Sequence, residues 1–157
     1  MTRDTRKSVM NSKFRNGTVL AFDFGEKRIG VAVGDFTLSI AHPLTTVQGT
    51  GQRQCLEAIA LLIKEWRPVV LVVGLPSHPD GAEHATGRLC QRFADRLKGR
   101  FGLPTALVDE RLTSAAAAES LRESGLVARK HKAVLDQVAA QHILQTYFDG
   151  CRHDAAA

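Results

Sequence analysis

The sequence predicts an α/β fold in which a mixed β-sheet is covered by helices on both faces. Three observations lead to this prediction. Two apolar runs, at residues 19–24 and 29–33, are separated by a short polar turn and have the form of a β-hairpin. The run at 69–75 is apolar throughout, which is typical of a strand buried on both faces. Between and after these runs, apolar residues recur at the spacing of helices.

Length and composition indicate one ordinary domain. The chain has 157 residues, of which 44% are hydrophobic and 24% charged, enough to build a single core. No apolar run approaches the roughly 20 residues that span a bilayer, and the N-terminus has no segment resembling a secretory signal. The three cysteines are scattered without metal-ligand spacing. We therefore expect a cytoplasmic protein that does not bind membranes.

The net charge of +5 is concentrated at the N-terminus, where residues 1–16 contain five basic residues and one acidic residue. The rest of the chain is nearly neutral, so overall basicity does not itself indicate nucleic-acid binding. Residues 1–16 are polar and lack periodicity. We expect them to form a disordered basic extension, residues 17–150 to form the folded domain, and residues 151–157 to form a flexible tail.

The first hairpin carries an acidic residue, Asp23, at the end of its first run, with Lys27 and Arg28 beside it. An unpaired charge is costly to bury, so Asp23 needs compensation. Three interpretations fit. Asp23 is a metal ligand beside a phosphodiester, or the glycine-bordered turn holds a nucleotide phosphate as in sugar kinases and actin-like ATPases, or Asp23 pairs with Arg28 or caps a turn.

The remaining elements follow in a clear order. Residues 38–47 predict a third strand, which Pro43 should confine to a sheet edge or a bulge. Helices are predicted over 52–66, around Leu89–Leu97, from 113 or 114 to 123 and over 132–148, with a strand at 105–108. This is the element order of the ribonuclease-H-like fold.

The sequence predicts which faces of two helices are exposed or buried. The helix around Leu89–Leu97 has an arginine stripe, which we interpret as a solvated face rather than an RNA track; it consists of Arg88, Arg92 and Arg96. The last helix is expected to bury one apolar face, made of Val134, Leu135, Val138, Ala139, Ile143 and Tyr147.

Three carboxylates lie at the ends of predicted elements. Asp23 ends the first strand, Glu110 follows the strand 105–108, and Asp136 is in the first turns of the last helix. In this topology the first strand is central, so the ends of its neighbours lie close to it. Carboxylates are the ligands that Mg²⁺ or Mn²⁺ prefers. We therefore expect the three carboxylates to converge on one site for a divalent ion.

Four motifs together resemble the YqgF/RuvX family, whose ribonuclease-H-like members are related to Holliday-junction resolvases and assigned as pre-16S rRNA nucleases. The motifs are Asp23-Phe-Gly-Glu-Lys-Arg-Ile-Gly-Val-Ala, Val73-Gly-Leu-Pro76, Asp109-Glu-Arg-Leu-Thr-Ser114 and Leu135-Asp-Gln-Val-Ala-Ala140. The resemblance implies that Asp23, Glu110 and Asp136 are the catalytic, metal-binding set. It also implies that Lys27 and Arg28 contact phosphate.

Further basic residues are candidates for nucleic-acid contacts. Arg111 follows Glu110 and is interpreted either as a structural partner of the acids or as a phosphate ligand. The basic run just before Asp136 contains Arg129, Lys130 and Lys132, which are either solvated or in contact with a nucleic-acid backbone.

The function that the resemblance implies is metal-dependent cleavage at the 5′ end of pre-16S ribosomal RNA. Three alternatives remain open at this point. They are a Holliday-junction resolvase acting on branched DNA, a phosphate-binding ATPase of the actin-like group, and a nucleic-acid-binding module with a vestigial site.

Overall fold

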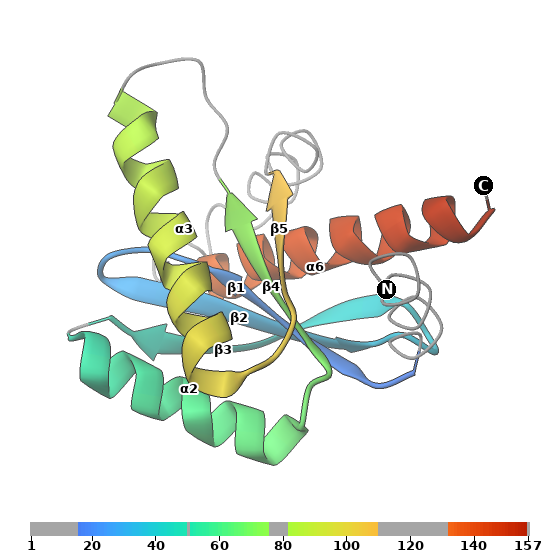
Figure 1. The fold of residues 1–157 in the computed structure, drawn as a ribbon, viewed down its shortest axis with the longest axis horizontal. Helices are drawn as coiled ribbons and strands as arrows, with labels where there is room; N and C mark the ends of the chain where they lie inside the picture. Colours follow the sequence, from blue (N-terminus) through green and yellow to red (C-terminus); the bar gives the residue numbers. More distant parts are fainter. Residues whose placement is uncertain (1–15, 50, 76–81, 110–131, 157) are drawn as a thin grey trace, which may run out of the picture.

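The computed structural model describes residues 16–49, 51–75, 82–109 and 132–156. In chain order the elements are β1 (Thr18–Asp23), β2 (Arg28–Asp35), β3 (Ile40–Gln48), α2 (Gln52–Trp66), β4 (Val70–Leu75), α3 (Ala82–Phe101), β5 (Thr105–Asp109) and α6 (Lys132–Ala156). The strands form one sheet in the order β3-β2-β1-β4-β5 (Figure 1). β1, β2 and β3 are antiparallel neighbours, whereas β4 and β5 run parallel to β1. The mixed sheet that the sequence predicts is confirmed.

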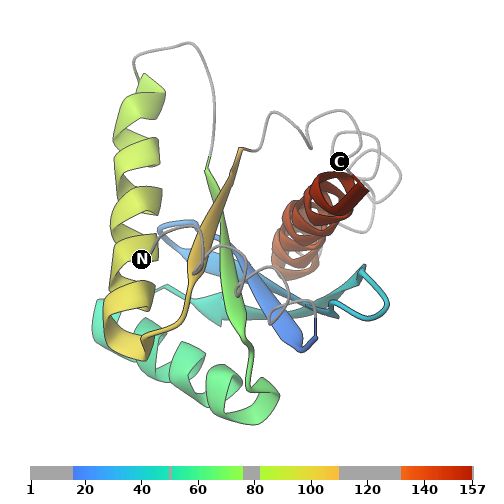
Figure 2. The same cartoon turned by 45° about the vertical axis from the view of Figure 1, so that its right-hand side comes forward.

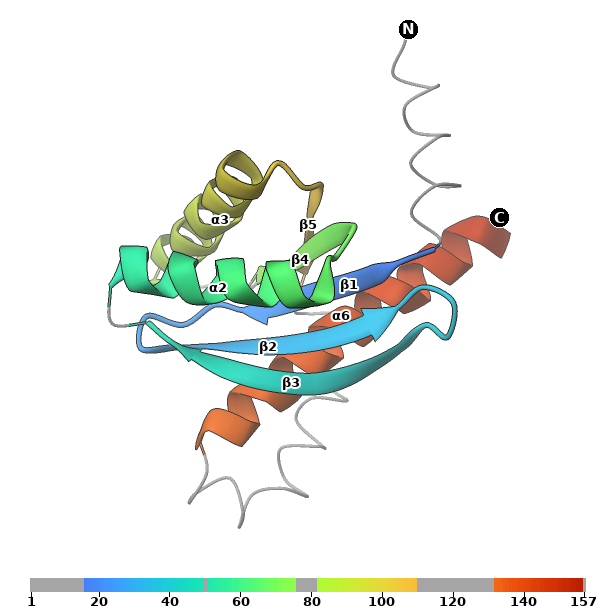
Figure 3. The ribbon, with the colours of Figure 1, turned by 90° about the horizontal axis from the view of Figure 1, so that it is seen from below.

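Helices cover both faces of the sheet. α2 and α3 lie on one face, and α6 crosses the other (Figures 2 and 3). Side chains alternate along a strand, so β1 sends Leu20 and Phe22 into a core with α2 and α3. It sends Val19 and Ala21 into a second core under α6. Both faces of β1 are thus buried, as its central place in the sheet requires.

β3 is an edge strand and contains a bulge, as Pro43 predicts. Its register with β2 shifts between Val31 and Ala32, which pair with Thr45 and Pro43, so Leu44 is the extra residue. A proline has no N–H to donate to a ladder, and the edge position leaves that side of the strand without a neighbouring strand.

Three glutamines of α6, one turn apart, cover this edge. Gln141 Nε2 donates to the Ala41 carbonyl at 3.1 Å, and the Ala41 N–H donates to Gln145 Oε1 at 3.0 Å. Gln145 Nε2 also donates to the Ser39 carbonyl at 2.9 Å, and Gln137 Nε2 donates to Thr46 Oγ1 at 3.2 Å. The N–H and carbonyl of Ala41 in β3, and the Ser39 carbonyl just before it, are thereby satisfied by side chains. Groups satisfied in this way are not available to pair with another strand.

Gln145 makes two of these four bonds. Gln145→Ala should lower the free energy of unfolding by about 1–3 kcal/mol, because the buried Ala41 N–H loses its acceptor. Urea unfolding followed by circular dichroism measures the change. Gln91→Ala is the control, since Gln91 is exposed and its hydrogen bond within the described residues is a 3.4 Å contact with Asp95. Equal effects of the two substitutions would show that α6 does not secure the edge.

The helix limits agree with the sequence in part. α2 spans the predicted residues, and α3 ends before Gly102, whose φ of +65° and N–H bond to the Lys98 carbonyl form the helix terminus. α6 continues to Ala156, past the expected end at 148, because Gly150 alone does not stop a helix packed on a sheet.

Among the described helices, none is both long and apolar enough to cross a membrane.

The expected buried face of α6 was wrong in part. Val134 is 43% exposed, and the buried residues are Ala140, Ile143, Leu144 and Phe148. The reason is that α6 packs against small residues of β2, where Gly34 lies beside the Phe148 ring. The side of α6 that faces the sheet is therefore centred on Ala140, Leu144 and Phe148, which are one turn apart, and is rotated away from Val134.

Candidate functional site

β1, β4 and β5 are parallel, so all three end at one edge of the sheet, with Asp23, Leu75 and Asp109 as their last residues. We call this the carboxyl edge. The turn after Asp23 and the start of β2 also lie there, because β1 and β2 form a hairpin. Residues carried by distant parts of the sequence therefore meet at this edge.

Asp23 lies on the α6 face of the carboxyl edge. It continues the alternation of Val19 and Ala21, which contact α6, and it pairs directly with Gly30 of β2. Its side chain is partly exposed. A carboxylate at this position keeps contact with water although the strand behind it is fully buried.

Asp136 reaches the same place from α6. A Cβ built on Gly30 would lie 1.9 Å from the Asp136 carbonyl oxygen and 2.9 Å from its Cβ. Only a glycine permits this approach, because any other side chain would overlap the helix backbone. Since Gly30 is also the partner of Asp23, the structure brings Asp23 and Asp136 beside the same glycine, on the α6 face of the sheet.

Arg28 forms an ion pair with Asp136. Its Nε donates to Asp136 Oδ2 at 2.7 Å, and the two side chains are 32% and 22% exposed. This charge-assisted bond joins β2 to α6 and fixes the orientation of the carboxylate. One of the three interpretations of Asp23 from the sequence paired it with Arg28. In the structure, the ion pair of Arg28 is with Asp136.

The donor set at this edge is made of carboxylates. Within the ranges that the structure describes, no three His, Cys, Asp or Glu side chains are grouped to hold a metal ion. Glu110, the expected third carboxylate, directly follows Asp109 in the chain but lies outside the described residues. Asp109 itself ends β5 at the carboxyl edge and is partly exposed.

Of the other residues expected to contact nucleic acid, the structure describes some and not others. Lys27 is exposed at the tip of the hairpin, beside the carboxyl edge. Lys132 is the first residue of α6, on the same helix as Asp136. Arg111, Arg129 and Lys130 lie outside the described residues, as do residues 1–15 of the expected basic extension and the helix expected from 113 or 114 to 123.

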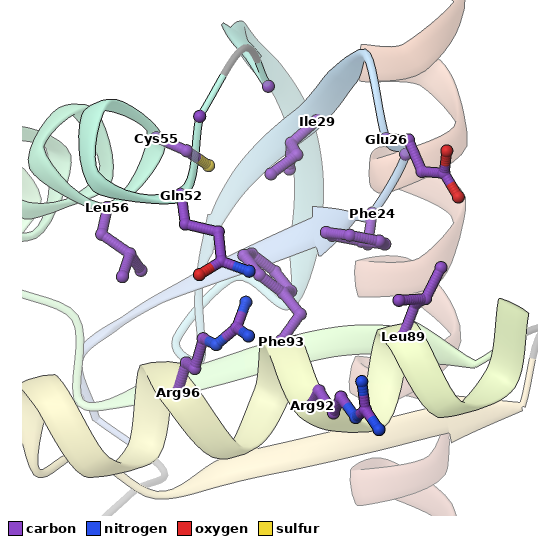
Figure 4. A pocket seen from close by; sticks show the side chains of 13 residues that line it. Phe24, Glu26, Ile29, Gln52, Cys55, Leu56, Leu89, Arg92, Phe93 and Arg96 are labelled. Carbon is purple, nitrogen blue, oxygen red and sulfur yellow. The ribbon is translucent and has the colours of Figure 1, made fainter.

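A cavity of about 260 Å³ opens on the other face of the same edge (Figure 4). It lies between the hairpin tip, the start of α2 and the middle of α3. Phe24, Cys55 and Phe93 form part of its apolar wall, and burial raises the pKa of the Cys55 thiol. Arg92 and Arg96 of α3 line it as well. The arginine stripe was interpreted as a solvated face, and its three members are exposed as expected. Two of them, Arg92 and Arg96, also border this cavity.

The strand order, with a carboxylate at the end of its central strand, defines the ribonuclease-H-like class. The chain is similar in fold to RuvC of T. thermophilus, solved in complex with a Holliday junction substrate, with a TM-score of 0.54 and 16% identity over 85% of this chain and 94% of that chain. It is also similar to the fowlpox virus Holliday junction resolvase, with a TM-score of 0.54 and 12% identity over 85% and 98% of the two chains.

The chain belongs to the RuvX family, described as Holliday junction resolvase, which it matches over residues 17–150. A relative from Methylobacillus flagellatus, named "Putative pre-16S rRNA nuclease", is 62% identical over 134 residues, which are 85% of this chain and 92% of the relative. A relative of the same name from Nitrosomonas eutropha is 57% identical over 142 residues, 90% of each chain.

Proposed function

We propose that this protein is a metal-dependent nuclease that processes the 5′ end of pre-16S ribosomal RNA in the cytoplasm. The observation that carries the proposal is the meeting of Asp23 and Asp136 at Gly30, on one face of the carboxyl edge. The substrate is proposed from the names of relatives that are 62% and 57% identical to this chain.

The carboxylates fit a hard divalent cation. Asp23 and Asp136 supply oxygen ligands on one face, and Glu110, next to Asp109 in the chain, is the proposed third ligand. Held by these residues, Mg²⁺ or Mn²⁺ would supply the activation of a water for attack on phosphorus and the stabilisation of the leaving oxygen. The close packing of α6 on Gly30 fixes the placement of Asp136 at this edge.

Arg28 has two tasks in this proposal. It holds the Asp136 carboxylate through the 2.7 Å bond, and its partly exposed guanidinium lies beside the path by which a phosphodiester reaches the carboxylates. Guanidinium groups bind phosphate oxygens with two donors at once. We assign Lys27, on the exposed hairpin tip, to contact with the phosphate backbone further along the strand.

One alternative keeps support: resolution of branched DNA. The family description and the titles of the similar structures name Holliday junctions. The same carboxylates would serve either substrate, because the chemistry acts on a phosphodiester in both.

A side-by-side assay separates these functions. The purified chain is incubated with Mg²⁺ or Mn²⁺ and either a pre-16S RNA carrying its 5′ leader or a four-way DNA junction. We expect cleavage of the RNA at a defined 5′ position and none of the junction. Defined cuts in the junction alone would establish the resolvase instead, and binding without cleavage of either would leave a nucleic-acid-binding module.

The backbone contact of Lys27 gives a second measurement. Lys27→Ala should weaken RNA binding a few-fold and reduce the slope of log K against log salt by about 0.7, the value for one phosphate contact on a single strand. The free energy of unfolding should change by less than about 0.5 kcal/mol, since the side chain is exposed. Lys64→Ala, at the far end of α2, is the control. An unchanged salt slope would remove Lys27 from the interface.

A further inference from the structure

We propose that the cavity between the hairpin tip, α2 and α3 binds one unpaired nucleotide of the RNA strand, its base inside and its phosphate on Arg92 and Arg96. The proposal rests on the proposed nuclease function and deepens it, because it names the part of the substrate that the enzyme recognises. It adds a site on the face of the sheet opposite Asp23 and Asp136.

The wall of the cavity suits a flat ring. Phe24 supplies the partly exposed aromatic ring of the wall, and its centroid lies 4.9 Å from that of the buried Phe93 (Figure 4). Leu89 lies near Phe24, and Leu56 lines the α2 side of the cavity (Figure 4). A base that enters beside aromatic rings gains stacking energy whatever its identity. A dry cavity of 150 Å³ in another protein accepts benzene, so about 260 Å³ is enough for one nucleobase. It is below the usual size of pockets for larger ligands, which favours one nucleotide over two.

The arginines suit a phosphate. Arg92 and Arg96 are one turn apart on α3, and both side chains are exposed. Among the described residues neither guanidinium forms an ion pair, and Arg96 Nη1 and Nη2 donate to the Gln52 side-chain oxygen at 2.6 and 2.9 Å. Gln52 therefore holds Arg96 at the α2 side of the cavity without neutralising it. The acidic lining residue, Glu26, is on the hairpin side of the mouth (Figure 4).

The position of the cavity connects it to the nuclease site. Phe24, Gly25 and Glu26 line it, and they directly follow Asp23 in the chain. A strand that passes over the hairpin tip therefore reaches the carboxylates on one face and the cavity on the other. A free nucleoside monophosphate has the same chemistry as an unpaired nucleotide, so the test must distinguish these two sources.

The test measures binding in EDTA, so that cleavage plays no part. The probes are a labelled single-stranded RNA of about ten nucleotides, a blunt RNA duplex of the same sequence, and AMP. Arg92→Ala/Arg96→Ala is compared with Arg88→Ala/Arg100→Ala, which removes two charges from the same exposed helix outside the cavity. Thermal unfolding followed by circular dichroism checks that both variants are folded.

We expect the cavity variant to bind the single strand at least about tenfold more weakly, with the duplex affected less than twofold and the control variant close to the parent. For binding of the single strand by the cavity variant, the slope of log K against log salt should fall by about 0.7 to 1.4. The slope for the control variant should stay unchanged. The proposal would be overturned if the cavity variant lost as much affinity for the duplex as for the single strand, or if the two variants lost affinity equally. Either result would show that the arginines act only as a charged surface. Loss of AMP binding with the strand unaffected would also overturn it, in favour of a free nucleotide.

The two proposals fail in different ways. If the parent cuts pre-16S RNA and binds the single strand while the cavity variant binds like the control, only the cavity proposal is wrong. If the parent neither binds nor cuts RNA, the proposed function is wrong and the cavity proposal falls with it.

Discussion

Asp23→Asn should reduce cleavage by about a hundredfold or more, the effect of removing one essential charged group from an active site. The same variant should lose the stabilisation that Mn²⁺ gives the parent. A ligand that binds only the folded state raises the free energy of unfolding, by about 2.7 kcal/mol at a concentration 100 times its Kd. The substitution keeps the shape of the side chain at the end of β1 but removes the charge that attracts the ion. Thermal unfolding of both proteins, with and without Mn²⁺, measures this.

Asp35→Asn is the matched control for Asp23→Asn. Asp35 is the last residue of β2, at the opposite end of the same hairpin, where its Oδ1 accepts a 2.7 Å bond from the Thr37 N–H that an asparagine oxygen can also accept. The Asp35→Asn protein should retain both cleavage and the stabilisation by Mn²⁺. An Asp23→Asn protein that is destabilised to the same degree with and without Mn²⁺, yet still cuts RNA, would show that Asp23 has a structural role.

Local patterns in the sequence were sufficient for most of the fold. The apolar runs on each side of residues 25–27 predict the β1–β2 hairpin, and the helical spacing of 52–66 predicts α2 with its limits. Pro43 predicts both the edge position of β3 and its bulge, because it lacks the N–H that a central strand needs. Each of these depends on residues that are near one another in the chain.

The contacts between distant elements could not be predicted in this way. Arg28 and Asp136 are 108 residues apart, and nothing in the local sequence favours that pair over Arg28 with Asp23. The glutamine stripe of α6 is visible at a spacing of four residues, but its partner, the backbone of β3, is known only once the helix is docked. Arg92 and Arg96 likewise gain a cavity only from the packing of α3 beside α2.

Gly30→Ala should cause a large loss of stability. The added Cβ would lie 1.9 Å from the carbonyl oxygen of Asp136, a backbone atom that cannot rotate away, so α6 must shift as a whole. Overpacking of this kind costs about 1–3 kcal/mol, occasionally more. Urea unfolding measures the loss in the free energy of unfolding. Alanine is otherwise the better residue inside a regular element, so a loss must come from the contact.

The same shift should also impair the site. Asp136 moves with α6 away from β2, the strand that pairs with Asp23. A displacement of a catalytic group by about 1 Å can reduce the rate a hundredfold. Gly150→Ala in α6 is the control. A Cβ there meets nothing within 4 Å, so this variant should gain about 0.5–1 kcal/mol and keep its activity. If Gly30→Ala were instead as stable and active as the parent, α6 would not pack on β2 as closely as described, and the meeting of Asp23 and Asp136 would lose its structural basis.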